Sequence, residues 1–209
     1  MVARDLHPST RTNSVNAPAN ETAAHEVVLV RHGETEWTLT GQHTSFTDIP
    51  LTERGREQAR ELGEKLAAWD FALVLSSPMQ RTQETCRLAG LGEGMQLDAD
   101  LAEWNYGEYE GRTTKQIRDE VPGWSVFTYP SPGGEAPEAV EARADRVIAR
   151  AVAADGPVAL FSHAHVLRVI GARWIGLHAR DGRWFALSTA SLSVLGYERE
   201  QRVMERWNT

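Results

Sequence analysis

Short apolar runs that alternate with amphipathic helical segments constrain the fold of this chain more than any other feature. The expected strands cover residues 26–31, 71–75, 95–101 and 157–161, and two or three closing strands lie within 186–197 and 202–207. The expected helices cover residues 51–69, 78–88, 115–120, 138–154 and 165–176. Strands that alternate with helices are typical of parallel sheets with helical crossovers. We therefore predict an α/β fold, a single domain with a mainly parallel central sheet and helices on both faces.

Length and composition fit this interpretation. The chain has 209 residues, which is enough for one domain and leaves little for a second. Residues 1–22 are rich in Ser, Thr, Asn, Pro and Ala, so we predict a flexible tail there and a folded domain over residues 23–209. Because the sequence contains neither a run of 18 apolar residues nor the apolar stretch of a signal peptide, we expect no membrane association.

Charge and cysteine content narrow the partners. The chain has 22 Lys and Arg against 29 Asp and Glu, and its net charge of −7 argues against nucleic-acid binding. A few arginines in a cleft can still bind an anionic substrate. The single cysteine, Cys86, cannot form an internal disulfide, which favours a reducing, cytoplasmic location.

Polar residues follow several of the predicted strands. Arg31 and His32 end the first strand, Arg81 follows the second, Glu103 the third and His163 the fourth. In an open α/β sheet, ligands bind beyond the carboxyl ends of the strands. Two helices would begin at this edge, after Pro78 and after His163, and helix N-termini beside arginines favour anions such as phosphate. Taken singly, each of these residues is more often structural, and only their combination points to a site.

The combination resembles the histidine phosphatase superfamily, which includes cofactor-dependent phosphoglycerate mutases, fructose-2,6-bisphosphatases and many acid phosphatases. The matching motifs are LVRHGETEW at 29–37, DIPLT at 48–52, SSPMQRTQET at 76–85, LAEWNYGEYEG at 101–111 and SH at 162–163. They occur in the family's order and span residues 26–197. Segments 41–48 and 103–107 most resemble a phosphatase branch that includes small actinobacterial acid phosphatases and the fungal sedoheptulose-bisphosphatase type.

The resemblance implies a phosphoglycerate mutase-like fold and a role for each residue. His32 would attack phosphorus as a neutral imidazole and form a phosphohistidine, while its other ring nitrogen donates to a backbone carbonyl. Arg31, Arg81 and His163 would surround the phosphoryl oxygens, with His163 serving best when protonated. Glu103 would protonate the leaving oxygen and then activate water, and the nearby phosphate should raise its pKa, which suits an acid. Further contacts to phosphate or substrate would come from Thr38, Thr44, Ser45, Tyr106 and Ala164, with no metal and no cofactor.

Departures from the family pattern favour hydrolysis over transfer. Ala164 stands where the family usually has Gly, which is tolerable unless a positive φ is required. Thr38 replaces the mutases' Asn, and Thr114 replaces their Lys. The interval between Arg118 and Arg143 contains no Lys or Arg, whereas mutases place an arginine pair in the corresponding insert. A doubly charged intermediate would be poorly retained without that pair.

The sequence thus favours an acid phosphatase-like phosphomonoester phosphatase that acts on a small phosphorylated metabolite such as a sugar phosphate. The alternatives are a phosphoglycerate mutase-type phosphotransferase, a non-catalytic phosphate-binding module, and a metallohydrolase that uses His32, His163 and His165. Aromatic residues between 104 and 132 would either hold the substrate or simply pack. Because family members are often dimers, a homodimer is an option.

Overall fold

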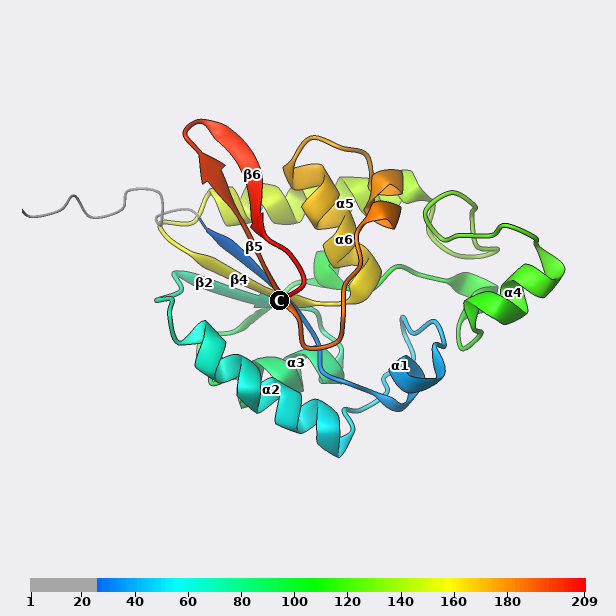
Figure 1. Ribbon diagram of the computed structural model, residues 1–209, viewed down its shortest axis with the longest axis horizontal. Coiled ribbons are helices and arrows are strands. Elements are labelled where there is room, and N and C mark those ends of the chain that lie inside the picture. The colour runs from blue at the N-terminus through cyan, green and yellow to red at the C-terminus, as the bar shows by residue number, and fades with distance from the viewer. Residues whose placement is uncertain (1–25) are drawn as a thin grey trace, which may run out of the picture.

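The computed structural model describes residues 26–209, and its centre is a six-stranded sheet (Figure 1). The strands are β1 (Val27–Arg31), β2 (Leu73–Ser76), β3 (Gln96–Leu97), β4 (Val158–Ser162), β5 (Leu192–Glu198) and β6 (Gln201–Arg206). They are arranged in the order β3-β2-β4-β1-β5-β6. The four strands from β3 to β1 are parallel, and β5 and β6 are antiparallel additions at one edge. The predicted flexible tail over residues 1–22 lies outside the described residues.

Helices cover both faces of the sheet, as predicted. Strand β1 shows why, because its residues alternate between two buried clusters. Val27 and Leu29 pack with residues of α5 (Pro137–Val152) and α6 (Ala164–Trp174). Val28 and Val30 pack with residues of α2 (Glu53–Leu66) and α3 (Gln80–Leu88) on the other face. A strand buried on both faces is typical of a parallel α/β sheet.

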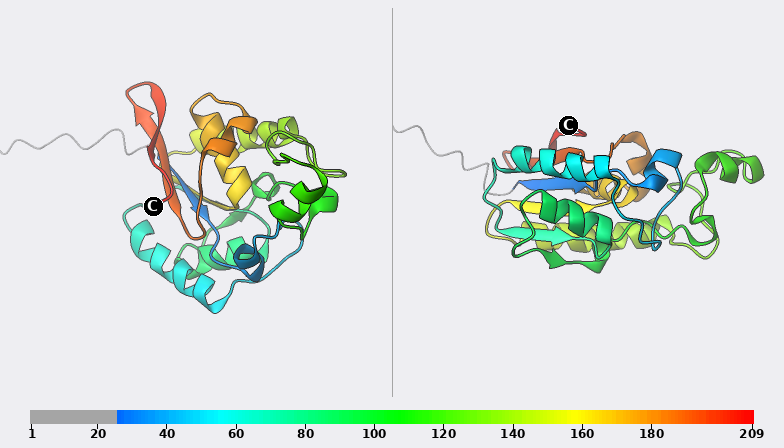
Figure 2. Two further views of the ribbon diagram at one scale, coloured as in Figure 1. Left: turned by 45° about the vertical axis from the view of Figure 1, so that its right-hand side comes forward. Right: turned by 90° about the horizontal axis from the view of Figure 1, so that it is seen from below.

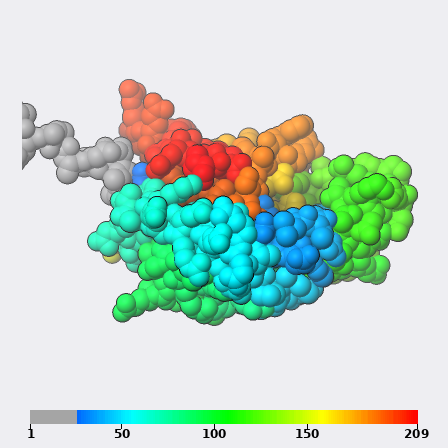
Figure 3. Space-filling view, turned by 60° about the horizontal axis from the view of Figure 1, so that its bottom comes forward, coloured from blue at the N-terminus to red at the C-terminus, as the bar shows by residue number. Residues whose placement is uncertain are grey.

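Two short helices lie beyond one end of the sheet (Figure 2). The first, α1 (Glu36–Thr40), occupies a stretch for which we expected only irregular structure, and it begins with a capping box between Thr35 and Thr38. The second is α4 (Thr114–Glu120), close to the prediction. The segment around α1 lies between α2 and the 105–130 segment that contains α4 (Figure 3). These segments place loops over the carboxyl ends of the strands.

Strand boundaries differ from the prediction at two places. The predicted third strand is reduced to the two residues of β3, because its second half forms a short 3-10 helix, Ala99–Leu101. Strand β5 begins at Leu192 rather than near residue 186. The residues before it form a loop, and the backbone carbonyl of Leu187 in that loop points back to Arg31 at the end of β1.

Candidate active site

His32 lies directly after β1 with its ring orientation fixed by the backbone. The backbone N–H of His32 donates to the Ser162 carbonyl at 3.0 Å, and its ring Nδ1 lies 2.7 Å from the Gly33 carbonyl oxygen. Because a carbonyl only accepts, Nδ1 carries the proton and Nε2 keeps its lone pair. Burial and the charges of Arg81 and Arg31 hold the pKa of His32 well below its usual range. The neutral imidazole and the carbonyl contact both agree with the expectation.

Gly33 explains how the loop after β1 approaches α2 so closely. A Cβ atom added at Gly33 would lie 2.4 Å from the carbonyl oxygen of Gly55 in α2, far inside normal contact. The Gly33 N–H also donates to the hydroxyl of Thr85 in α3 at 3.1 Å. Two helices on one face of the sheet therefore fix the backbone next to His32, and only glycine allows this spacing.

A cavity of about 160 Å³ opens beside His32. It is lined by seven of the residues expected at the site, Arg31, His32, Thr38, Thr44, Glu103, Tyr106 and Ala164. The other three, Ser45, Arg81 and His163, are buried and do not line it. The predicted residues therefore form two groups, one that lines the cavity and one that is buried behind it.

Arg31 carries the clearest sign of an anion site in this cavity. Its Nη1 donates to the Leu187 carbonyl at 2.5 Å, whereas its Nε is buried without a hydrogen-bond partner among the described residues. Burial lowers the pKa of Arg31, although the Glu103 carboxylate opposes the shift. A buried, unpaired guanidinium N–H is costly, and a phosphate oxygen would satisfy it.

Arg81 and His163 form a buried pair behind the cavity. Arg81 donates from Nε to Nδ1 of His163 at 3.2 Å, and its terminal nitrogens donate to the carbonyls of Ser45 and Thr47 at 3.1 and 3.2 Å. Since His163 Nδ1 accepts, its proton is on Nε2, which donates to the Ser77 hydroxyl at 2.8 Å. Burial and Arg81 keep the pKa of His163 well below its usual range. The expectation of a protonated His163 is therefore wrong, because a neighbouring cation already donates to its ring.

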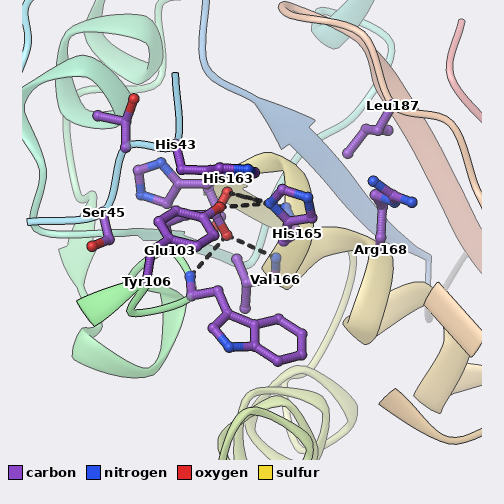
Figure 4. A network of polar contacts seen from close by, with 12 residues as sticks. His43, Ser45, Glu103, Tyr106, His163, His165, Val166, Arg168 and Leu187 are labelled. Atoms are coloured by element: carbon purple, nitrogen blue, oxygen red, sulfur yellow. Dashed lines mark hydrogen bonds and ion pairs between the residues drawn. The ribbon is translucent and has the colours of Figure 1, made fainter. Parts of the chain in front are cut away.

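Glu103 is held at the N-terminus of α6 (Figure 4). Its carboxylate accepts from the N–H groups of Trp104, His165 and Val166 at 2.9, 3.1 and 3.0 Å. Burial alone raises the pKa of Glu103. Hydrogen bonding and charge from His165 outweigh this effect, together with the charge of His163 and the hydrogen bond from the Trp104 N–H, so the pKa is held well below its usual range. The protein's own groups, His165 first among them, therefore favour the charged carboxylate, and the raised pKa that we expect beside a bound phosphate stays a prediction.

Carboxylates of the protein itself accept hydrogen bonds at the N-termini of both helices that we expected to begin at this edge. In α6 the carboxylate is Glu103. In α3 the Gln80 N–H donates to Asp48 Oδ1 at 2.9 Å. Ala164, the first residue of α6, lines the cavity and is not among the residues with positive φ, so a side chain is tolerated where the family usually has glycine.

The hydroxyl groups expected to contact substrate make bonds within the protein. Thr38 Oγ1 accepts from the Thr35 N–H at 2.9 Å and donates to the Thr35 carbonyl at 2.7 Å. Thr44 Oγ1 donates to the Gln42 carbonyl, and Ser45 Oγ donates to the Glu110 carboxylate at 2.6 Å. These residues shape the loop over the cavity, and only Thr38 and Thr44 reach its surface.

Several lining residues were missing from the predicted site, chiefly His43 and His165. His43 Nε2 lies 3.2 Å from the Thr114 hydroxyl, and burial together with His165 lowers the pKa of His43 to about 3. His165 Nδ1 lies 2.6 Å from the Tyr106 hydroxyl. His43 lies within segment 41–48, and His165 follows the SH motif at 162–163. Their closeness to these motifs was the one feature of the sequence that could have placed them at the site.

The arrangement of histidines does not form a metal-ligand set. Within residues 26–209, no three His, Cys, Asp or Glu side chains converge as ligands for a metal ion. His32 and His163 lie with their ring centroids 5.2 Å apart, but both nitrogens of His163 are already engaged by Arg81 and Ser77. What the cavity offers instead is one unprotonated imidazole nitrogen, a guanidinium and a carboxylate. These are the functional groups that phosphoryl transfer to a histidine nucleophile requires.

Comparison with known proteins identifies the family. The model of the histidine phosphatase superfamily (branch 1) matches residues 27–209, so the chain belongs to this superfamily, and its enzyme class is that of the phosphoric monoester hydrolases. An acid phosphatase of Mycobacterium tuberculosis is 42% identical over 178 residues, covering 83% of this chain and 87% of that protein. The sedoheptulose 1,7-bisphosphatase of Saccharomyces cerevisiae is 31% identical over 182 residues, covering 72% and 67%.

A solved structure agrees with these relatives. The product of an open reading frame of M. tuberculosis superposes with a TM-score of 0.84 at 39% identity, covering 88% of this chain and 97% of that one. The predicted phosphoglycerate mutase-like α/β fold and phosphatase class are thereby confirmed. None of the helices in residues 26–209 combines the length and apolar character that crossing a membrane requires.

Proposed function

We propose that this protein hydrolyses phosphomonoesters of small metabolites, sugar phosphates above all, through a phosphohistidine on His32. One observation carries the proposal. His32 is a buried neutral imidazole whose Nδ1 is tied to the Gly33 carbonyl, and it lines the same cavity as Arg31, whose Nε lacks a partner within residues 26–209. A lone-pair nitrogen beside an unsatisfied cationic donor suits attack on a bound phosphoryl group.

In the first step, Nε2 of His32 attacks phosphorus as the bond to the leaving oxygen breaks. The Gly33 carbonyl stabilises the positive charge that the ring gains, through the Nδ1–H bond. Arg31 binds the phosphoryl oxygens directly. Arg81 and His163 lie behind the cavity, where Arg81 adds fixed positive charge and holds the Thr44–Thr47 loop in place.

Glu103 transfers the protons in both steps. It supplies a proton to the leaving oxygen, which departs as an alcohol, and then removes one from the water that attacks the phosphohistidine. Hydrogen bonding and charge from His165 hold its pKa low, whereas a phosphate dianion bound beside it raises the pKa. Phosphate binding itself would thus give Glu103 the proton that the first step requires.

Hydrolysis is favoured over transfer to a second site on the substrate. The relatives support this choice, since one is named an acid phosphatase and another a sedoheptulose 1,7-bisphosphatase. The interval between Arg118 and Arg143, where mutases place an arginine pair, contains no cation.

Phosphate release from p-nitrophenyl phosphate and a panel of sugar phosphates, with EDTA present, tests this function. We expect metal-independent release that is lost in His32→Ala. Activity abolished by EDTA and restored by Mg²⁺ or Zn²⁺ would instead favour the metallohydrolase, and isomerised phosphate esters without phosphate release would favour the mutase.

We also propose the cellular setting of the enzyme. A cytoplasmic location is supported by the single cysteine, Cys86, which is buried and whose pKa is raised to about 12 by burial. The net charge of −7 supports the proposal that the protein does not bind nucleic acid. A homodimer and the division into a tail over residues 1–22 and a domain over residues 23–209 stay predictions, to be tested by light scattering and limited proteolysis.

A further inference from the structure

A second recess adjoins the catalytic cavity. It has a volume of about 380 Å³ and shares His43 and His165 with the first. We call it the arginine recess, because three of its lining residues are Arg118, Arg168 and Arg183. These come from α4, α6 and the 3-10 helix η4 (Ala179–Trp184), three segments that are far apart in the sequence. Trp124, Phe127 and Trp184 supply aromatic walls.

The charge of the arginine recess is opposite to that of the whole chain. Three arginines and two histidines line it, but no Asp or Glu does, in a protein whose net charge is −7. Within residues 26–209, none of the three arginines forms an ion pair with a carboxylate. By contrast, Arg112 and Arg173 on neighbouring segments pair with Glu120 and Asp145. A recess of unpaired cations concentrates anions.

Each guanidinium is held on one side and keeps further N–H groups for a ligand. Arg168 donates to the carbonyls of Gly182 and Arg183 at 2.9 and 3.2 Å and lies over the Phe127 ring at 4.5 Å. Arg118 donates from Nε to the Trp124 carbonyl at 2.8 Å. Arg183 lies over the Trp184 ring at 4.6 Å. The remaining terminal nitrogens make no hydrogen bonds among the described residues, and Arg118 and Arg183 are exposed, so these groups are accessible to a ligand.

The position of the recess relative to the reacting phosphate follows from α6. Ala164 lines the catalytic cavity, and Arg168 lies one turn further along the helix, about 6 Å away along its axis. In Figure 4, Arg168 lies on the side of His165 away from Glu103. A group bound at Arg168 therefore belongs to the part of the substrate beyond the bond that breaks, several bonds from the reacting phosphorus.

We infer that the arginine recess binds a second anionic group, a phosphate or a carboxylate, on the leaving portion of the same substrate. The inference rests on the proposed phosphatase function and narrows its substrates to metabolites with two anionic groups, such as sugar bisphosphates or phosphorylated sugar acids. The cations are supplied by α4, α6 and η4, and all three arginines lie outside residues 119–142. The lack of Lys and Arg in residues 119–142 therefore leaves this second site intact.

Substrate pairs that differ in the second anion test the inference. A comparison of fructose 1,6-bisphosphate with fructose 6-phosphate tests whether the recess binds a second phosphate. A comparison of 3-phosphoglycerate with glycerol 3-phosphate tests whether it binds a carboxylate. We expect the wild type to favour the doubly anionic member of at least one pair in kcat/KM. In Arg183→Met this preference should fall about tenfold or more, the usual loss for a charged hydrogen-bond partner. The exposed Arg180 of η4, which does not line the recess, provides the matched control, and Arg180→Met should leave the preference and both rates unchanged.

Binding separates this inference from the proposed function. Calorimetric titration of the preferred doubly anionic compound into His32→Ala requires no turnover, and its affinity should fall about tenfold when Arg183→Met is added. Arg168→Met provides a second variant, checked for folding by circular dichroism because Arg168 also holds η4. Retained p-nitrophenyl phosphatase activity with no anion preference, or equal binding with and without Arg183, would overturn the recess assignment alone. If the wild type releases no phosphate from any substrate but binding still depends on Arg183, only the proposed phosphatase function would be overturned.

Discussion

Replacement of Arg143 by methionine should destabilise the enzyme and slow it, although this residue does not line the cavity. Arg143 lies on α5 with its side chain 8% exposed, and it pairs with both oxygens of Glu135 at 2.9 and 3.0 Å. Its Nη1 also donates to the carbonyls of Asp100 and Ala102 at 2.7 and 2.6 Å. Ala102 directly precedes Glu103, so one buried guanidinium positions the segment that carries the proposed acid.

The expected loss follows from these contacts. Removal of one partner of a buried ion pair typically costs about 3–5 kcal/mol. The Glu135 side chain is 25% exposed and partly regains hydration, so we expect the free energy of unfolding to fall by about 2–4 kcal/mol. For a domain of this size, that corresponds to a decrease in Tm of about 5–15 °C. Phosphorylation by alkyl phosphates should slow as well, because Glu103 loses its fixed position.

Differential scanning calorimetry with a matched control measures this effect. Arg146 lies on the same helix and pairs with Asp100, but its side chain is 60% exposed. Because exposed pairs contribute little, Arg146→Met should leave Tm and turnover nearly unchanged. Equal shifts in the two variants, or an Arg143→Met enzyme with wild-type Tm, would show that the Glu103 segment does not depend on this ion pair.

Two further predictions concern proton transfer and pH. Glu103→Gln should slow the phosphorylation step by about 10²–10⁴-fold for an alkyl phosphate and far less for p-nitrophenyl phosphate, whose leaving group is stable without a proton; equal slowing of both in single-turnover assays would remove Glu103 from the acid role. The stability of the fold should fall from pH 7 to pH 5, because His32 and His163 have lowered pKa values in the folded protein and take up protons near pH 6.5 only when it unfolds. Urea unfolding at three pH values tests this, and a His163→Gln variant with an unreduced pH dependence would refute the part assigned to His163.

Much of the fold could be predicted from local patterns. The apolar runs at β1, β2 and β4 are buried on both faces, so their composition alone indicates a central parallel sheet. The boundaries of β3 and β5 were less predictable, because pairing partners rather than composition determine where an edge strand begins and ends. The helix α1 was missed, since it is five residues long and depends on a capping box rather than on an apolar face.

The site was predictable in its residues but not in its electrostatics. The motifs contain His32, Arg31 and Glu103, which line one cavity. The lowered pKa of Glu103 depends on its contact with His165, and that of His163 on burial and on the nearby Arg81 side chain. Such contacts between distant segments follow from the tertiary structure, and no spacing in the sequence indicates them.

Identification of the phosphorylated residue during turnover tests the central claim most directly. The enzyme is mixed with a substrate, quenched in base within milliseconds, digested and examined by mass spectrometry. We expect one phosphate on His32, stable in base and lost in acid, that forms and decays at rates compatible with kcat and is absent from His32→Ala. A phosphate on another residue, or steady turnover by His32→Ala at a tenth of the wild-type rate or more, would contradict nucleophilic catalysis by His32.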